Sequence, residues 1–319
     1  MSRRNPPRKR LRGLLQVAIS AILLAVALRQ VGWGELTGAL AQIRLPWLAA
    51  AWGLFLLGVA VRAYRWQVLL RGLGVERPLA ELTLWYFVGG FFNVLLPTGF
   101  GGDAVRVVEL AQDTQRVGPV LNSVVVDRYL GLISLLLMGL VAGVLRPDLA
   151  SPALVGLLAV LAVGGMLVAW LLTRPWWRNA AGGDSRWARW LRRTKAADVA
   201  AGLTSYRRGA VAQAFLVSVV FNVMQIGWNV LIGTGLGLHL PIMFYFVIVP
   251  LTSAALLLPA VGGLGVREIS YITLLGSAGV PQGIAMAFSL SIYAITALTG
   301  LVGGVMYLVQ GLNRTRRRT

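Results

Sequence analysis

Apolar runs recur along this chain at close to the length that a helix needs to cross a lipid bilayer, about 20 residues. They begin near residues 13, 47, 82, 119, 152, 210, 241 and 281. Hydrophobic residues make up 57% of the 319 positions and charged residues only 13%, so few charges interrupt the runs. We therefore expect an all-α polytopic membrane protein with a single transmembrane domain over residues 13–312.

The net charge of the chain is +19, from 30 Lys and Arg against 11 Asp and Glu. In a soluble protein such an excess would suggest nucleic-acid binding. Here the basic residues gather at the ends of the apolar runs, where cytoplasmic loops and anionic headgroups favour them. No recognisable nucleic-acid module accompanies them. The expected partner of this charge is therefore the bilayer, and not nucleic acid.

Few residues are available for chemistry. The chain has no cysteine and one histidine, His239, so we expect no disulfide, no thiolate nucleophile and no zinc site built on histidines. His239 lies near the end of an apolar run, where we interpret it as an interfacial residue, with a ligand role as the alternative. We expect no metal, no cofactor and no catalytic residue.

Clusters of basic residues orient the chain. They occupy residues 3–12, 62–77, 174–208 and 314–318, and all four are expected on the cytoplasmic side. The two tails, residues 1–12 and 313–319, and the linker 174–209 are then cytoplasmic. The external turns are expected at residues 29–44, 146–151 and 238–241. We interpret the run at residues 13–28 as an uncleaved first helix; the alternative is a cleaved signal peptide.

Two of the apolar segments contain a break. "LLPTGFGG" follows the run at residues 82–96, and "LLPAVGGLG" interrupts residues 241–279. If the basic clusters are cytoplasmic, the first of these segments begins and ends inside, and the second begins and ends outside. This predicts an inverted repeat, residues 47–145 and 210–312, in which a re-entrant hairpin lies between two spans. The chain then has six spans and two re-entrant segments; the alternative is eight plain spans with prolines as kinks.

Charged residues follow both breaks. Asp103, Arg106 and Glu109 follow the first, and Arg106 and Glu109 share a helix face by their spacing; Arg267 and Glu268 follow the second. A charge at the centre of a membrane helix costs about 2.5–3.5 kcal/mol, so such residues usually pair or face a polar cavity. The alternative is that these charges only stabilise the fold and do not bind a substrate.

Four further charged residues allow the same two explanations. Asp127 and Arg128 lie inside the segment 119–145, and either face a cavity or lie at the cytoplasmic boundary, where their charges reach the headgroups. For Arg62 and Arg65, which are one helical turn apart, we favour the boundary position.

Arginines beside glycine turns favour an anion, because guanidinium groups and backbone N–H groups at a helix start both bind phosphate. "GFGG" and "GGLG" are not P-loops, since no Lys-Ser pair follows them. A phosphate attached to a lipid is the anion that a bilayer delivers most readily into such a cavity.

Four motifs in this sequence, "RAYRWQVLL", "NVLLPTGFGGDAVR", "VVVDRYLGL" and "LLPAVGGLGVREISY", are similar to those of a known family. They resemble the membrane region of the lysylphosphatidylglycerol synthases and of related stand-alone, flippase-like proteins, over about residues 11–312. The resemblance implies a bacterial or archaeal inner-membrane protein that moves a phospholipid or a polyprenyl-phosphate-linked sugar between leaflets. It implies substrate-binding positions at Asn93, Pro97, Gly102, Asp103, Arg106, Asp127, Arg128, Gly263, Gly265, Arg267 and Glu268.

The chain departs from the bifunctional synthases because no aminoacyltransferase domain follows residue 312, so we do not expect it to make lysylphosphatidylglycerol itself. The preferred function is an anionic-lipid translocase. The alternative is an accessory or scaffold subunit of a membrane glycosyltransferase or lipid-modifying enzyme, in which the charged pairs hold helices together. An intramembrane enzyme ranks third, because nothing in the sequence combines a nucleophile with its base.

Overall fold

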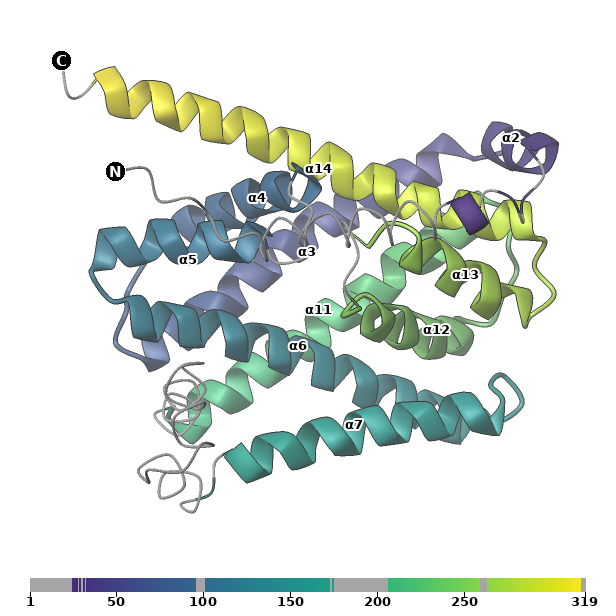
Figure 1. The fold of residues 1–319 in the computed structure, drawn as a ribbon, viewed down its shortest axis with the longest axis horizontal. Helices are drawn as coiled ribbons and strands as arrows, with labels where there is room; N and C mark the ends of the chain where they lie inside the picture. The colour runs from purple at the N-terminus through teal and green to yellow at the C-terminus, as the bar shows by residue number, and fades with distance from the viewer. Residues whose placement is uncertain are drawn as a thin grey trace, which may run out of the picture. The chain divides into compact units, whose positions relative to one another are not determined.

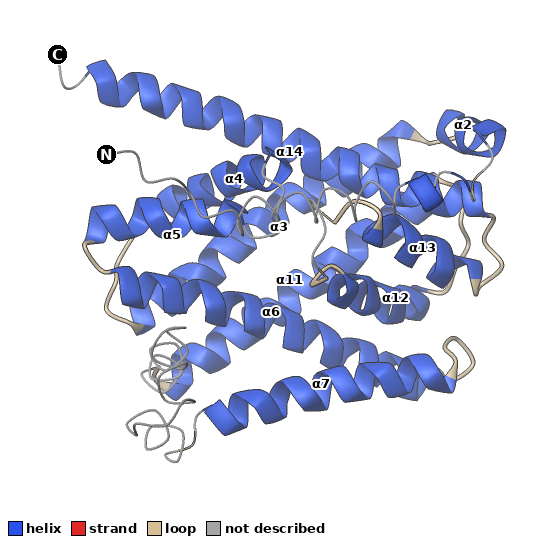
Figure 2. Cartoon of the chain, in the orientation of Figure 1, coloured by secondary structure: helices blue, strands red, loops and turns tan. Residues whose placement is uncertain are grey.

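The structure is a computed structural model, which describes residues 25–95 apart from 28, 30 and 32, and then residues 101–172, 174, 206–258 and 263–316. Every regular element in these ranges is a helix (Figure 2). The predicted all-α architecture is therefore confirmed.

Five helices within the described ranges are long and apolar enough to cross a membrane. They are α3 (Leu45–Gly72), α6 (Val117–Leu145), α7 (Pro152–Leu172), α11 (Arg208–Gly235) and α14 (Gln282–Arg316). Each coincides with a predicted span, whereas the predicted first span, residues 13–28, lies mostly outside the described residues. The chain is a polytopic membrane protein.

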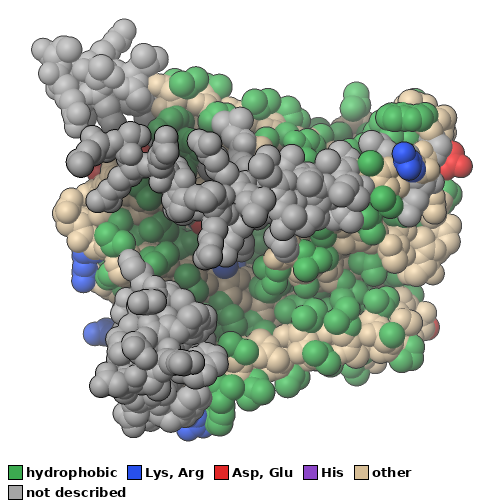
Figure 3. Space-filling view, viewed as in Figure 1, with side chains coloured by type: hydrophobic (Ala, Val, Ile, Leu, Met, Phe, Trp, Pro, Cys, Tyr) green, Lys and Arg blue, Asp and Glu red, His purple; other side chains and the backbone are tan. Residues whose placement is uncertain are grey.

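Hydrophobic side chains cover much of the face drawn in Figure 3. Large apolar side chains are exposed on the long helices: Val160 on α7 is 69% exposed and Leu301 on α14 is 62% exposed. Soluble monomers rarely expose apolar patches of this extent. Lipid tails are the solvent that suits these surfaces.

Four shorter helices flank the two predicted breaks. They are α4 (Leu79–Leu95), α5 (Gly101–Thr114), α12 (Ile242–Ala255) and α13 (Val266–Gly276). At about 1.5 Å per residue, α4 is about 25 Å long and α13 about 17 Å, less than the roughly 30 Å of a hydrocarbon core. The turns themselves, residues 96–100 with Pro97 and residues 259–262, lie outside the described residues.

The predicted external turn at residues 29–44 is partly wrong, because it contains the helix α2 (Trp33–Ala41). Leu36 and Ala39 are three residues apart and buried on one side of this helix. Helix α2 packs against α14. An amphipathic segment of nine residues is short enough to look like a turn in a hydropathy profile, and it folds as a helix because α14 covers its apolar face.

The described residues group into two compact units. The first unit draws on Met1–Leu56, Leu84–Val105 and Ile226–Thr319, and the second on Leu57–Thr83 and Arg106–Gln225. Each unit therefore contains segments from both predicted repeat halves, and helices α3, α4, α5 and α11 contribute to both units. The inverted repeat itself stays a prediction.

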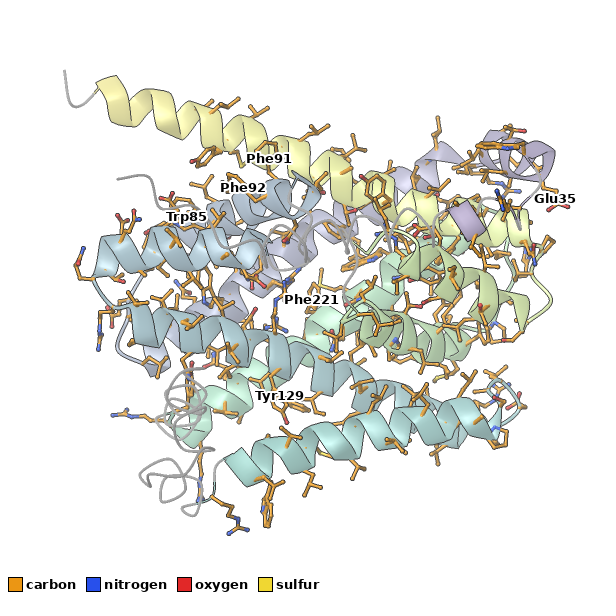
Figure 4. The ribbon with its side chains drawn as sticks, viewed as in Figure 1. Glu35, Trp85, Phe91, Phe92, Tyr129 and Phe221 are labelled. Carbon is orange, nitrogen blue, oxygen red and sulfur yellow. The ribbon has the colours of Figure 1, made fainter. Side chains whose placement is uncertain are left out.

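Glycines bring α4 and α14 together in the first unit. A Cβ atom on Gly303 would overlap the carbonyl oxygen of Phe87, and one on Gly300 would lie 3.3 Å from the carbonyl oxygen of Gly90. Phe91 and Phe92 of α4, which are labelled in Figure 4, lie against the same part of α14, where the Phe92 and Tyr307 rings are 5.5 Å apart. Such small-residue contacts are how helices pack closely within membranes.

In the second unit, α6 and α7 run side by side (Figure 1). A Cβ atom on Gly143 would lie 3.0 Å from Val155, and one on Gly165 would lie 3.0 Å from Ile133. In the first unit, α12 and α13 pack against each other, and α13 packs against α14 (Figure 1). These contacts position the charged residues described next.

Candidate functional site

The second unit contains a group of charged side chains that we call the arginine cluster: Arg62, Arg65, Arg106 and Asp127. Arg65 Nε on α3 donates to Asp127 Oδ1 on α6 at 2.6 Å, and these side chains are 3% and 0% exposed. Arg65 Nη1 also donates to Ser218 Oγ on α11, at 3.0 Å. We favoured a boundary position for Arg65 from which its charge reaches the headgroups; the structure instead buries this charge against Asp127, on the part of α3 that continues to Gly72.

Helix α6 makes room for the Arg65 guanidinium at Gly131. A Cβ atom there would lie 2.8 Å from Arg65 Nη1. Gly131 follows Asp127 by four residues, so both lie on the face of α6 that receives Arg65. Asn222 on α11 donates to the Gly131 carbonyl oxygen at 3.0 Å and to Ser134 Oγ at 2.8 Å. A glycine at this position of "DRYLGL" is therefore explained by packing, because a larger residue would collide with the Arg65 side chain.

Arg106 enters the same cluster from α5. It is 2% exposed, and its guanidinium lies 4.9 Å from the centre of the Trp66 ring. Trp66 is held in turn by a 2.9 Å hydrogen bond to Ser123 Oγ. Arg62 lies 5.4 Å from the Phe221 ring. The guanidinium groups of Arg65, Arg106 and Arg62 all act electrostatically on the Asp127 carboxylate, which produces a buried region rich in positive charge.

Polar contacts in the second unit also bring the start of α4 near the end of α5. Arg77 Nη1, just before α4, lies 3.4 Å from Glu81 Oε1 and 3.8 Å from Asp113 Oδ2. Arg116 Nη1, just after α5, donates to the carbonyl oxygen of Gly74 at 2.7 Å. The first residues of α4 and the last residues of α5 therefore lie close together.

Within the first unit, the end of α4 meets the start of α5 at Asn93 and Gly102. Gly102 N donates to Asn93 Oδ1 at 2.8 Å. A Cβ atom on Gly102 would overlap the carbonyl oxygen of Gly89, so no larger residue fits there. Asp103, in the first turn of α5, is 8% exposed. Asn93 and Gly102 thus hold the reversal of the chain, and Pro97 lies outside the described residues.

A second charged group, which we call the α13 cluster, consists of Gly265, Arg267, Glu268 and Ser289. Gly265 caps α13 with a φ of +83°, a conformation that side chains with a Cβ rarely adopt. Glu268 Oε2 accepts a 2.6 Å hydrogen bond from Gly265 N. Glu268 Oε1 accepts one from Ser289 Oγ on α14 at 3.0 Å, and Arg267 Nε lies 3.4 Å from the same oxygen. Gly263, two residues earlier, also has a positive φ, +77°.

Arg267 is 6% exposed, and its guanidinium lies 5.3 Å from the centre of the Tyr293 ring on α14. Its Nη2 atom is buried and has no hydrogen-bond partner in the described part of the chain. Buried donors are nearly always satisfied in folded proteins, so this Nη2 atom is a position at which a water molecule or a ligand would supply the acceptor.

The structure brings some predicted site residues together and leaves others apart. Arg106 joins Asp127 in the second unit; in the first, Asn93 joins Gly102, and Gly265 joins Arg267 and Glu268. Arg128 is half-buried beside Asp127 on α6. Sequence reasoning named Arg65 but did not include it among the site residues, although it lies in the motif "RAYRWQVLL". Among the described residues, no group of three or more His, Cys, Asp or Glu side chains could hold a metal ion.

The model of one protein family, the lysylphosphatidylglycerol synthase TM region, matches residues 13–304. The chain belongs to this family. Both the arginine cluster and the α13 cluster lie inside the matched region. No curated protein matches the chain. The lysylphosphatidylglycerol synthase TM region is a membrane domain associated with a lipid-related function, and the resemblance expected from the sequence is confirmed.

Proposed function

We propose that this protein moves an anionic lipid between the two leaflets of a bacterial or archaeal inner membrane. The lipid is a phospholipid or a polyprenyl-phosphate-linked sugar, and the protein acts as a transporter and not as an enzyme. The observation that carries the proposal is the environment of Arg267, a buried residue at the start of the short helix α13. Its Nη2 atom has no hydrogen-bond partner among the described residues.

A phosphate is the group that best completes this site. The planar fork of a guanidinium offers two parallel N–H donors that match two phosphate oxygens. In the structure, Glu268 supplies one weak contact to Arg267, at 3.4 Å, and the Tyr293 ring supplies a cation–π contact. These two contacts stabilise the charge without occupying the Nη2 donors.

The short helices support a path through the membrane. Helices α4 and α13 are both too short to span it, and the α4–α5 segment begins and ends near Gly74 and Arg116. Both features favour re-entrant hairpins that turn inside the bilayer. Irregular backbone at that depth is tolerated where it lines a cavity, which is the arrangement found at substrate sites in inverted-repeat transporters.

The arginine cluster offers a second place for the lipid phosphate. Arg106 and Arg62 lie over aromatic rings near Asp127, and all three residues belong to the second unit. A transporter needs to bind its substrate in more than one conformation, so that the lipid can leave one leaflet and enter the other. We assign the α13 cluster to phosphate binding in one of these conformations and the arginine cluster to phosphate binding in another.

The test is lipid movement in proteoliposomes. Arg267→Lys keeps the charge but loses the planar fork, and we expect it to weaken phosphate binding by about 1–3 kcal/mol, about 5- to 150-fold. Lipid movement should fall by a similar factor, while the unfolding temperature stays near that of the wild type. Arg44→Lys is the matched control, because Arg44 is exposed in the same unit. Wild-type rates in both Arg267→Lys and Arg106→Lys would contradict the proposal.

The accessory-subunit alternative has one observation in its favour. Arg65 and Asp127 form a close pair that joins α3 to α6, as expected for charges that only hold helices together. Under that function, wild-type vesicles would move lipid no faster than protein-free vesicles. The protein would instead copurify with a glycosyltransferase or lipid-modifying enzyme from its own membrane.

A further inference from the structure

Glu268 and Arg267 are isolated from other charges in their part of the chain. Residues 242–309, which contain α12, α13 and most of α14, include no other Asp, Glu, Lys, Arg or His. The other titratable side chains of this stretch are four tyrosines, Tyr245, Tyr271, Tyr293 and Tyr307, which are neutral at ordinary pH. Tyr271 donates to Asn229 Oδ1 on α11 at 3.0 Å, and Tyr293 lies against Arg267. One cation and one anion therefore balance each other here.

Neutral donors, and not Arg267, hold the Glu268 carboxylate most closely. The contacts from Gly265 N and Ser289 Oγ measure 2.6 and 3.0 Å, whereas Arg267 Nε lies at 3.4 Å. Glu268 is 0% exposed. Arg267 thus contributes the balancing charge more than it contributes the hydrogen bonding, so it can be redirected while Glu268 stays in place.

We propose that Glu268 binds a proton when the lipid phosphate binds Arg267, so that lipid movement is coupled to proton movement. The inference rests on the proposed role of Arg267. A phosphodiester adds one negative charge to the neutral Arg267–Glu268 pair. Burying an unbalanced anion costs so much free energy that a nearby carboxylate takes up a proton instead. One proton from water on a Glu268 oxygen restores a neutral set, and no other bond forms or breaks.

The network can accept this proton without rearrangement. A protonated Glu268 still accepts the N–H of Gly265 through one oxygen and can donate its O–H to Ser289 Oγ through the other. Glutamine does the same with its amide, and it is an accepted residue at this position of a capping box. Glu268→Gln therefore mimics the protonated state while preserving the start of α13.

Because a proton on Glu268 favours the phosphate-bound state, phosphatidylglycerol binding should tighten as the pH falls. Calorimetry of short-chain phosphatidylglycerol binding to the detergent-solubilised protein, in two buffers of different ionisation enthalpy, measures the protons taken up. We expect about one for the wild type and about none for Glu268→Gln. Glu35→Gln, at an exposed carboxylate on α2, is the control and should match the wild type.

A pH gradient across proteoliposomes supplies the second readout. Wild-type protein should accumulate fluorescent phosphatidylglycerol in the leaflet that faces the alkaline side, and Glu268→Gln should lose this bias. Binding or movement without proton uptake and without a response to the gradient would overturn the coupling and leave the transport function intact. If the wild type neither binds nor moves phosphatidylglycerol, the phosphate-binding role of Arg267 fails, and the coupling fails with it.

Discussion

At the scale of single residues, the buried charges of this protein differ in how completely they are satisfied. The carboxylate of Asp127 is contacted by Arg65, which also bonds to Ser218, so this pair joins three helices. Arg267 keeps a buried Nη2 atom without a hydrogen-bond partner in the described chain. A satisfied pair stabilises the fold, whereas an incompletely satisfied guanidinium is suited to bind a ligand.

The Arg65–Asp127 pair gives a prediction for stability. Asp127→Asn leaves the Arg65 guanidinium buried without its closest counter-charge, and we expect a loss of about 3–5 kcal/mol in the free energy of unfolding. The double change Asp127→Leu with Arg65→Met should recover most of it, because an apolar pair of similar volume carries no desolvation penalty. Thermal unfolding in detergent measures both. An unchanged melting temperature in Asp127→Asn would refute the structural role of the pair.

The exposed pair Arg146–Asp148 is a matched control for this experiment. Arg146 donates to Asp148 at 2.9 and 2.8 Å, and this hydrogen bonding, more than the charge itself, lowers the pKa of Asp148. The Asp148 side chain is 57% exposed, so water replaces the contact when it is lost. Asp148→Asn should leave the melting temperature unchanged.

At the scale of helices, the glycines of α4, α5 and α14 set how closely these elements approach. The largest effect is expected at Gly303, where an added methyl group would overlap a backbone carbonyl oxygen, which cannot rotate away. Gly303→Ala should therefore separate α4 from α14 and destabilise the protein by about 1–3 kcal/mol.

Gly53→Ala provides the comparison for that change. Gly53 lies within α3, is exposed, and has no atom within 4 Å of the position that its Cβ would take. Because alanine is the better helix former, this variant should unfold at the wild-type temperature or above it. Equal melting temperatures for the two variants would show that the α4–α14 contact is not close in solution.

At the scale of the whole molecule, the arrangement of charges predicts the topology. Cysteine is absent from the chain, so single cysteines can report on sidedness. Residues introduced at Ser185 and Thr315 should react with impermeant thiol reagents only from the cytoplasm, and one at Ser151, in the exposed turn between α6 and α7, only from outside. Labelling at Ser185 from outside would reverse the orientation.

The same assay separates re-entrant hairpins from full spans. A cysteine at Thr98, between α4 and α5, should resist reagents added outside, since α4 is too short to carry it across. If α4 and α5 are both full spans, Thr98→Cys reacts from outside as readily as Ser151→Cys. That result would favour eight plain spans over six spans with two re-entrant segments.

The amino-acid sequence by itself determined the class, five of the six predicted spans, the two helix breaks and the family of this protein. These properties depend on composition and on local patterns, since about 20 apolar residues suffice to identify a span and glycines mark the breaks. Arg106, Asp127, Arg267 and Glu268 were found in the same way, as charges where a membrane core disfavours them.

Only the tertiary structure decided which charges meet. Arg65 and Asp127 are far apart in the sequence and come together because α3 continues past its apolar run and crosses α6 at Gly131. No local pattern contains that crossing, so Arg65 looked like a boundary residue. The contact of Ser289 with Glu268 likewise depends on α14 packing against α13. Which charged side chains meet depends on how the helices pack. Helix packing depends on residues that are distant in the chain, and the pattern within one segment does not contain them.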